Sequence, residues 1–197
     1  MAPGSDFERP ALAHLREPST VTPLGLVIGG AVQCFSWERD AQARFAKLAA
    51  QGASHVVNIG YGLGYAQEVF ERIPSLRVDL IEINPSVMAR ARRQSRLSTT
   101  EFHLAPWQQA LPGMNTDSAN IFFDAFPIEQ IFDYSAESFI RYIEPFLETV
   151  SGLAWSECYF IAFDQQEIRF PSPTNMQVNR VATTKLPQAF RKPGLTS

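Results

Sequence analysis

The chain has 197 residues, of which 45% are hydrophobic and 19% are charged, and its formal net charge is −3. This composition is typical of one globular domain with a buried core and excludes an intrinsically disordered chain. It also argues against nucleic-acid binding, because that requires a broad basic face and the longest basic run here is the short segment 90–93.

The sequence contains no membrane or export signal that we can identify. No charged segment followed by an apolar one opens the chain, and no apolar run approaches the length of a membrane span, so we expect a cytoplasmic protein that does not contact membranes. The two cysteines, Cys34 and Cys158, lie far apart without C-x-x-C spacing. They indicate neither a disulfide framework nor a metal site, and we expect two small buried side chains.

The first predicted segment, residues 1–22, is an irregular arm with several prolines and scattered charges. A single domain of residues 23–197 follows it. Apolar residues at helical spacing predict a helix from Trp37 to Gln51, with Ser36 as its N-cap and Gly52 at its end.

Strand-like and helical runs then alternate along the core, residues 37–164. The predicted strands are 55–59, 78–83, a short one around Phe102, 119–123 and 157–163. The predicted helices are 63–72, one that Asn84-Pro85 opens as N-cap and first residue, and 136–150. This alternation predicts an α/β fold with a mostly parallel sheet and helices on both faces. The tail, residues 165–197, contains one further strand candidate near 177–184.

The most informative motif follows the strand 55–59, where three glycines alternate: Gly60, Gly62 and Gly64. Glycines in this position permit positive φ angles and a close approach of the backbone to a ligand. Glu82, which ends the next strand 22 residues after Gly60, is suited to hydrogen-bond the hydroxyls of a ribose. The pattern therefore predicts a site for a nucleoside-containing cofactor.

The spacing of the glycines separates two classes of cofactor. A dinucleotide fingerprint needs its third glycine where this chain has Tyr65, so a nicotinamide oxidoreductase is the disfavoured alternative. The G-x-G-x-G spacing instead resembles motif I of class I S-adenosylmethionine-dependent methyltransferases.

Four further motifs accompany the glycine loop: Trp37-Glu38, Ile81-Glu82, Ala105-Pro106-Trp107-Gln108 and Asp124-Ala125-Phe126-Pro127. With them the chain resembles the guanidinoacetate N-methyltransferase family. That family has Trp-Glu, Glu-x-Gly-Phe-Gly, Ile-Glu, Leu-Trp-Glu-Asp and Tyr-Asp-Thr-Tyr-Pro in the same order. The resemblance covers about residues 27–164. It implies a Rossmann-like fold, here with a shortened C-terminal part, and S-adenosylmethionine as cofactor.

The resemblance also implies a role for each matched residue. The residues implied to contact S-adenosylmethionine are Asn58, Gly60, Tyr61, Gly62, Gly64, Glu82, Ile83, Pro106, Trp107 and Asp124. Glu38 and Asp124 are implied to hold a small guanidino or related cationic acceptor and to accept its proton, and Phe126 is implied to line the acceptor pocket. The chemistry agrees with this assignment, because a guanidinium stays protonated at neutral pH and pairs well with carboxylates.

Simpler explanations remain open for several of these residues. Glu38 can stabilise the start of a helix through the helix dipole, Asp124 can cap the next element, and Trp107 can belong to the core. The histidines, His14, His55 and His103, have no evident partner, and we expect no functional role for them.

The chain also departs from the family pattern. Asn58 and the pair Gln108-Gln109 replace acids, Phe126 replaces a tyrosine, and the segment after Phe163 is shorter. These departures leave open a degenerate domain that binds cofactor or a partner protein without turnover. They also leave open a pocket that a second chain completes in a homodimer.

Overall fold

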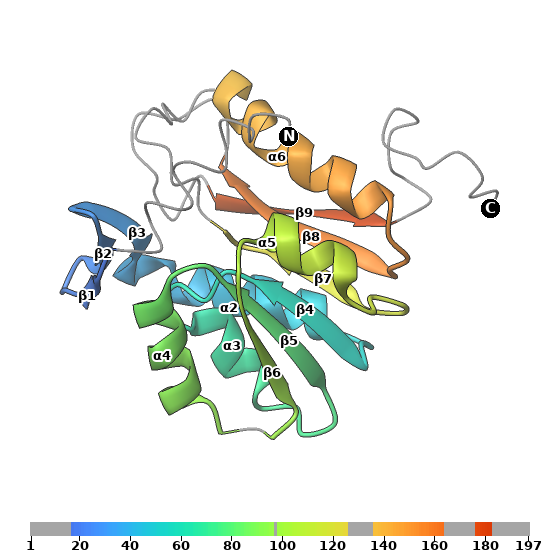
Figure 1. The fold of residues 1–197 in the computed structure, drawn as a ribbon, viewed down its shortest axis with the longest axis horizontal. Helices are drawn as coiled ribbons and strands as arrows, with labels where there is room; N and C mark the ends of the chain where they lie inside the picture. Colours follow the sequence, from blue (N-terminus) through green and yellow to red (C-terminus); the bar gives the residue numbers. More distant parts are fainter. Residues whose placement is uncertain (1–16, 97, 126–135, 164–175, 183–197) are drawn as a thin grey trace.

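The computed structural model describes residues 17–96, 98–125, 136–163 and 176–182 (Figure 1). Its centre is a six-stranded sheet in the order β6-β5-β4-β7-β8-β9. The strands are β4 (His55–Ile59), β5 (Arg77–Glu82), β6 (Thr100–Leu104), β7 (Asn120–Phe123), β8 (Glu157–Phe163) and β9 (Met176–Ala182). Neighbouring strands from β6 to β8 are parallel, and β9 runs antiparallel to β8. The prediction of a mostly parallel α/β sheet is confirmed.

Helices cover both faces of this sheet because side chains alternate between the faces along each strand. On one face, Val56 and Val78 pack with α2 (Arg39–Ala50) and α3 (Tyr65–Phe70), and Leu80 packs with α4 (Pro85–Gln94). On the other face, Val57 and Ile81 pack with α5 (Trp107–Ala110), the short 3₁₀ helix η2 (Leu111–Gly113) and α6 (Ala136–Ser151). Among the described helices, none has the length and apolarity needed to cross a bilayer.

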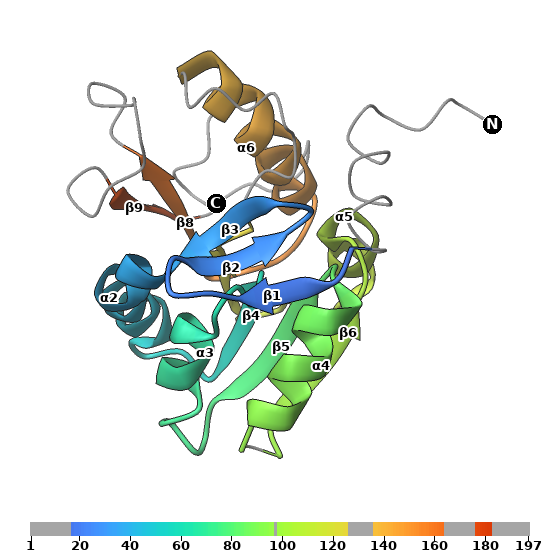
Figure 2. The same ribbon diagram turned by 90° about the vertical axis from the view of Figure 1, so that its left-hand side faces the viewer.

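A small antiparallel sheet precedes the main one and was not predicted. It consists of β1 (Ser19–Val21), β2 (Gly25–Ile28) and β3 (Ala31–Phe35), and it lies beside α3 and α4 (Figure 2). Gly29 and Gly30 join β2 to β3 with φ angles of +58° and +80°, as a two-residue hairpin turn of type I′ requires. The predicted irregular arm therefore gives way to strand structure at Ser19.

The boundaries of two helices test the predicted capping residues. Asn84 caps α4 as predicted, because its Oδ1 accepts hydrogen bonds from the backbone N–H groups of Ser86 and Val87 at 2.9 and 3.1 Å. The prediction of Ser36 as a cap was wrong. A short 3₁₀ helix, η1 (Ser36–Glu38), precedes α2, and the hydroxyl of Ser36 donates to the carbonyl of Pro23 at 2.9 Å.

Candidate functional site

The glycine loop connects β4 to α3 and packs tightly against neighbouring backbone. Gly60 has a φ of +92°, and a Cβ there would lie 2.7 Å from the backbone oxygen of Asp124. Gly62 has a φ of +53°, and a Cβ there would lie 3.2 Å from Sγ of Cys34. The loop therefore requires glycine at both positions, first for its backbone angles and second for its closeness to β7 and β3.

Glu82 ends β5 directly beside this loop. Its carboxylate is 8% exposed, and it accepts hydrogen bonds from the backbone N–H of Tyr61 at 3.0 Å and of Asn84 at 2.9 Å. Burial raises the pKa of Glu82, although these backbone donors oppose the shift. Each carboxylate oxygen can accept a second hydrogen bond, so Glu82 can serve both the loop and the hydroxyls of a ligand.

The side chain of Tyr61 points away from Glu82 towards α4. Its hydroxyl donates to Oε1 of Gln94 at 2.8 Å, and its ring lies 5.5 Å below the guanidinium of Arg90. Burial raises the pKa of Tyr61 to about 12. Arg90 also donates to the carbonyl oxygen of Gly62, and this hydrogen bond joins the glycine loop to α4. Only the backbone of Tyr61, and not its phenol, takes part in the contact with Glu82.

Asn58 lies under the loop in β4, between Leu80 and Phe122 of the neighbouring strands. Its side chain is fully buried, and Nδ2 donates to Oε1 of Gln67 in α3 at 3.1 Å. Its Oδ1 has no hydrogen-bond partner among the described residues. A buried acceptor without a partner costs about 1–3 kcal/mol, and this oxygen is therefore suited to accept a hydrogen bond from a ligand or a water.

A second group of polar residues lies beside the loop: Cys34 of β3, Glu38 of η1, and Asp124 directly after β7. Glu38 is 5% exposed; its Oε1 accepts from the backbone N–H of Phe35 at 3.0 Å and its Oε2 from Nε2 of Gln42 at 2.7 Å. Sγ of Cys34 lies 3.8 Å from the same Oε2. Asp124 follows β7, and its backbone N–H donates to the carbonyl of Ile59 at 2.9 Å.

Burial shifts the pKa values of the acidic groups in this cluster. It raises the pKa of Glu38, and burial together with the charge of Glu38 raises the pKa of Asp124 well above its usual value. Burial and then the charges of Glu38 and Asp124 raise the pKa of the Cys34 thiol. The three groups are therefore close enough to affect one another, and no ion pair joins either carboxylate to a basic side chain in the described part of the chain.

Sequence reasoning missed two members of this group, Cys34 and Gln42. Both stand four residues from Glu38, one before it and one after it, and this spacing was the available signal. The expectation that Cys34 would be an ordinary buried side chain holds for its burial. It did not anticipate the contacts of the thiol with Glu38 and the glycine loop.

The remaining predicted residues are placed differently. The ring of Trp107 packs edge-on against Phe123 and Phe146, at 5.6 Å from each ring, and belongs to the core. Pro106 precedes α5, and the N–H of Ala105 donates to the carbonyl of Glu82 at 3.1 Å, so this segment lies beside the end of β5. Ile83 follows Glu82 and is partly buried. Phe126 lies outside the described residues.

Comparisons with known proteins identify the fold. No protein-family model and no curated protein matches the sequence. A spermidine synthase from Thermotoga maritima is similar in structure with a TM-score of 0.54 and 14% identity, over 90% of this chain and 72% of that chain. An O-methyltransferase family protein from Burkholderia thailandensis and human N-acetylserotonin methyltransferase in complex with SAM are each 14% identical, with TM-scores of 0.49 and 0.44.

The chain covers only part of these methyltransferases. The similar region includes 70% and 68% of this chain, but 41% of the Burkholderia protein and 36% of the human enzyme. This chain likewise spans about half the length (54%) of two further similar structures. The similarity to the spermidine synthase, which has the TM-score of 0.54, confirms the Rossmann-like α/β fold predicted from the sequence.

Proposed function

We propose that this chain is an S-adenosylmethionine-dependent N-methyltransferase whose acceptor is a small guanidino compound or a related cation. The observation that carries the proposal is the pair of carboxylates, Glu38 and Asp124, beside a glycine loop that ends a parallel strand. In the described part of the chain no basic side chain neutralises this pair. A cationic acceptor would supply the missing charge.

The residues around the loop fit the proposed cofactor. Glu82 retains acceptor capacity for two ribose hydroxyls, and Asn58 offers the unpaired Oδ1 beneath the loop. The backbone of Gly60, Tyr61, Gly62 and Gly64 would lie against the methionine part. Pro106 and Ile83 would flank the adenine. Because the ring of Trp107 lies in the core, its role would be to pack beneath Pro106 and not to contact the adenine. When bound, S-adenosylmethionine supplies an activated methyl group on a sulfonium.

The carboxylate pair would orient the acceptor and remove its proton. Glu38 is held by Phe35 and Gln42, so it can fix the guanidinium in one orientation. The acceptor nitrogen would then be positioned to form its bond to the methyl carbon while the bond from that carbon to sulfur breaks. The proton would leave the nitrogen for the carboxylate of Asp124. Positioning supplies much of the remaining acceleration.

Asn58 supports a second candidate function. It lacks the charge of a carboxylate, which favours a degenerate domain that binds cofactor without turnover.

The acidic pair also supports a second class of acceptor for the proposed methyl transfer. It would accept an alkylammonium ion, and the name of the similar spermidine synthase makes polyamines a reasonable second group of acceptors to test.

The test measures methyl transfer to guanidines, amines and polyamines by mass spectrometry, together with calorimetric binding of S-adenosylmethionine and S-adenosylhomocysteine. Glu38→Gln and Asp124→Asn should abolish the product while the cofactor still binds. Glu148→Gln, at an exposed position on α6, is the matched control and should behave as wild type. Undiminished product from both site variants would overturn the assigned roles. Cofactor binding without any product across the panel would support the degenerate domain.

A further inference from the structure

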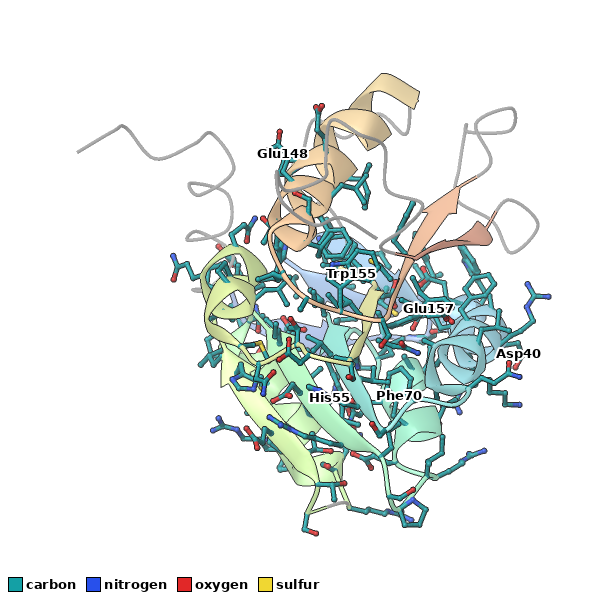
Figure 3. The ribbon with its side chains drawn as sticks, turned by 90° about the vertical axis from the view of Figure 1, so that its right-hand side faces the viewer. Asp40, His55, Phe70, Glu148, Trp155 and Glu157 are labelled. Atoms are coloured by element: carbon teal, nitrogen blue, oxygen red, sulfur yellow. The ribbon has the colours of Figure 1, made fainter. Side chains whose placement is uncertain are left out.

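A second polar cluster lies on the main sheet, away from the glycine loop. It combines side chains from three adjacent parallel strands: His55 of β4, Arg77 and Asp79 of β5, and Glu101 and His103 of β6. Asp79 stands in register with Glu101, and His55 with Arg77 (Figure 3 labels His55). These positions share the face that packs against α5 and α6 further along the strands. The expectation that His55 and His103 lack partners was wrong, and His14 lies outside the described residues.

Asp79 is the centre of the cluster. Its carboxylate is 1% exposed, with Nε2 of His55 at 2.5 Å from Oδ2 and Nε2 of His103 at 2.8 Å from Oδ1. Nη2 of Arg77 lies 3.2 Å from Oδ2 and 3.7 Å from Oε1 of Glu101. These partners together lower the pKa of Asp79 against the effect of its burial. A carboxylate this deep in a sheet is costly, and the surrounding donors explain how it is tolerated.

We propose that Asp79, Glu101 and His103 form a binding site for a divalent transition-metal ion of the zinc type. One ligand atom from each residue lies within 4.8 Å of the other two, and one imidazole with two carboxylates is a donor set that zinc accepts. The metal would take the place of the proton between Nε2 of His103 and Oδ1 of Asp79. Small side-chain shifts would bring the three ligand atoms to about 2.0–2.2 Å from the ion.

The cluster is open to solvent on the side where an ion must arrive. Glu101 is 61% exposed and His103 is 30% exposed, while Asp79 closes the inner side. Three protein ligands leave a fourth tetrahedral position for water or another small ligand. The arrangement therefore has both a path from solvent and an open coordination position.

His55 is a positioning residue in this site. It holds the second oxygen of Asp79, Oδ2, and so fixes the orientation of the carboxylate that presents Oδ1 to the ion. Partners of this kind, which contact a ligand and not the ion itself, typically change metal affinity by about 10–100-fold.

Arg77 should weaken metal binding, because its positive charge lies beside the carboxylates of Asp79 and Glu101 that would bind the ion. The side chain is 47% exposed, so its guanidinium can move into solvent when an ion binds. Removing this charge should therefore strengthen metal binding, while removing a ligand should weaken it. Opposite effects from neighbouring side chains are not expected of an ion that binds adventitiously.

The test titrates the purified 197-residue chain with Zn²⁺ by calorimetry and with Co²⁺ by visible absorption, which reports tetrahedral coordination. We expect one ion per chain, at least 100-fold weaker binding in His103→Gln and Glu101→Gln, about 10-fold weaker binding in His55→Gln, and tighter binding in Arg77→Gln. Glu148→Gln is the control for loss of an exposed carboxylate. His55→Gln should keep a tetrahedral Co²⁺ spectrum, which separates positioning from general unfolding.

Two results would overturn the proposal. One is the absence of saturable binding and of tetrahedral Co²⁺ bands in the wild-type protein. The other is equal affinity in the wild type, His103→Gln and Glu101→Gln, which would mean adventitious binding elsewhere. A melting curve of each metal-free variant confirms that it is folded. The proposal does not depend on methyl transfer, because the metal titration requires neither cofactor nor acceptor.

Discussion

Replacing Gly60 by alanine should destabilise the fold and abolish cofactor binding. The φ of +92° at Gly60 costs an L-residue about 1–2 kcal/mol. The new Cβ would also lie 2.7 Å from the backbone oxygen of Asp124 and 3.0 Å from its carbonyl carbon. Because backbone atoms cannot rotate aside, the overlap should add about 1–3 kcal/mol. We therefore expect the free energy of unfolding to fall by about 2–5 kcal/mol.

Gly52→Ala provides the matched control, because Gly52 has a φ of +73° but a Cβ added there would meet no atom of the described residues within 4 Å, apart from its neighbours in the chain. It should carry the conformational cost alone, about 1–2 kcal/mol. Urea unfolding measures both losses, and calorimetry with S-adenosylhomocysteine measures binding. The difference between the variants isolates the close packing of the loop on Asp124. If Gly60→Ala loses no more stability than Gly52→Ala and still binds the cofactor, the reasoning is refuted.

Three other substitutions have distinct expected outcomes. Asp124→Asn should raise the melting temperature at pH values above the raised pKa of Asp124, because a carboxylate with a raised pKa destabilises the fold once it ionises. As pH falls from that raised pKa towards the ordinary pKa of an aspartate, the gain should vanish, and an equal gain at every pH in a melting series would contradict this. Gln42→Ala removes the 2.7 Å hydrogen bond to Glu38, so urea unfolding should show a loss of about 1–3 kcal/mol and acceptor affinity should weaken without change in cofactor affinity. Tyr61→Phe should cost about 1 kcal/mol in the same unfolding assay but leave cofactor affinity unchanged, because Glu82 contacts the backbone of Tyr61; weakened cofactor binding would refute that assignment.

The strands of the main sheet were predictable because each is marked by residues that are close together in the sequence. Each strand is an apolar run between turn residues, and Asn84-Pro85 marks the start of α4 within the sequence itself. The small sheet was missed because β1 to β3 have only three to five residues each. The Gly29-Gly30 pair was its one strong signal, and a paired-glycine turn identifies a hairpin only when the flanking strands are recognised.

The parts of the site that sequence reasoning missed depend on contacts between elements. Nothing in the sequence distinguishes Gln42 from other helical residues, and only the folded structure shows that its amide donates to Glu38. The position of the Trp107 ring depends on Phe146 of α6, which lies far along the chain. His103 meets Asp79 only because β5 and β6 pair in one particular register. Periodicity predicts which side of an element is buried, but it contains no information about the partner that covers it.

The position of Glu38 relative to Asp124 depends on how the small N-terminal sheet packs against the rest of the domain. Cys34 lies in β3 and Glu38 in η1, which follows β3 directly, whereas Asp124 stands immediately after β7 of the main sheet. The backbone N–H of Ser19 donates to the hydroxyl of Ser86, and Nδ2 of Asn84 donates to the carbonyl of Glu17, so this sheet is fastened to the start of α4. A molecule that bridges the two carboxylates therefore joins both sheets. Its binding should slow amide hydrogen exchange across residues 19–35, far beyond the atoms it touches.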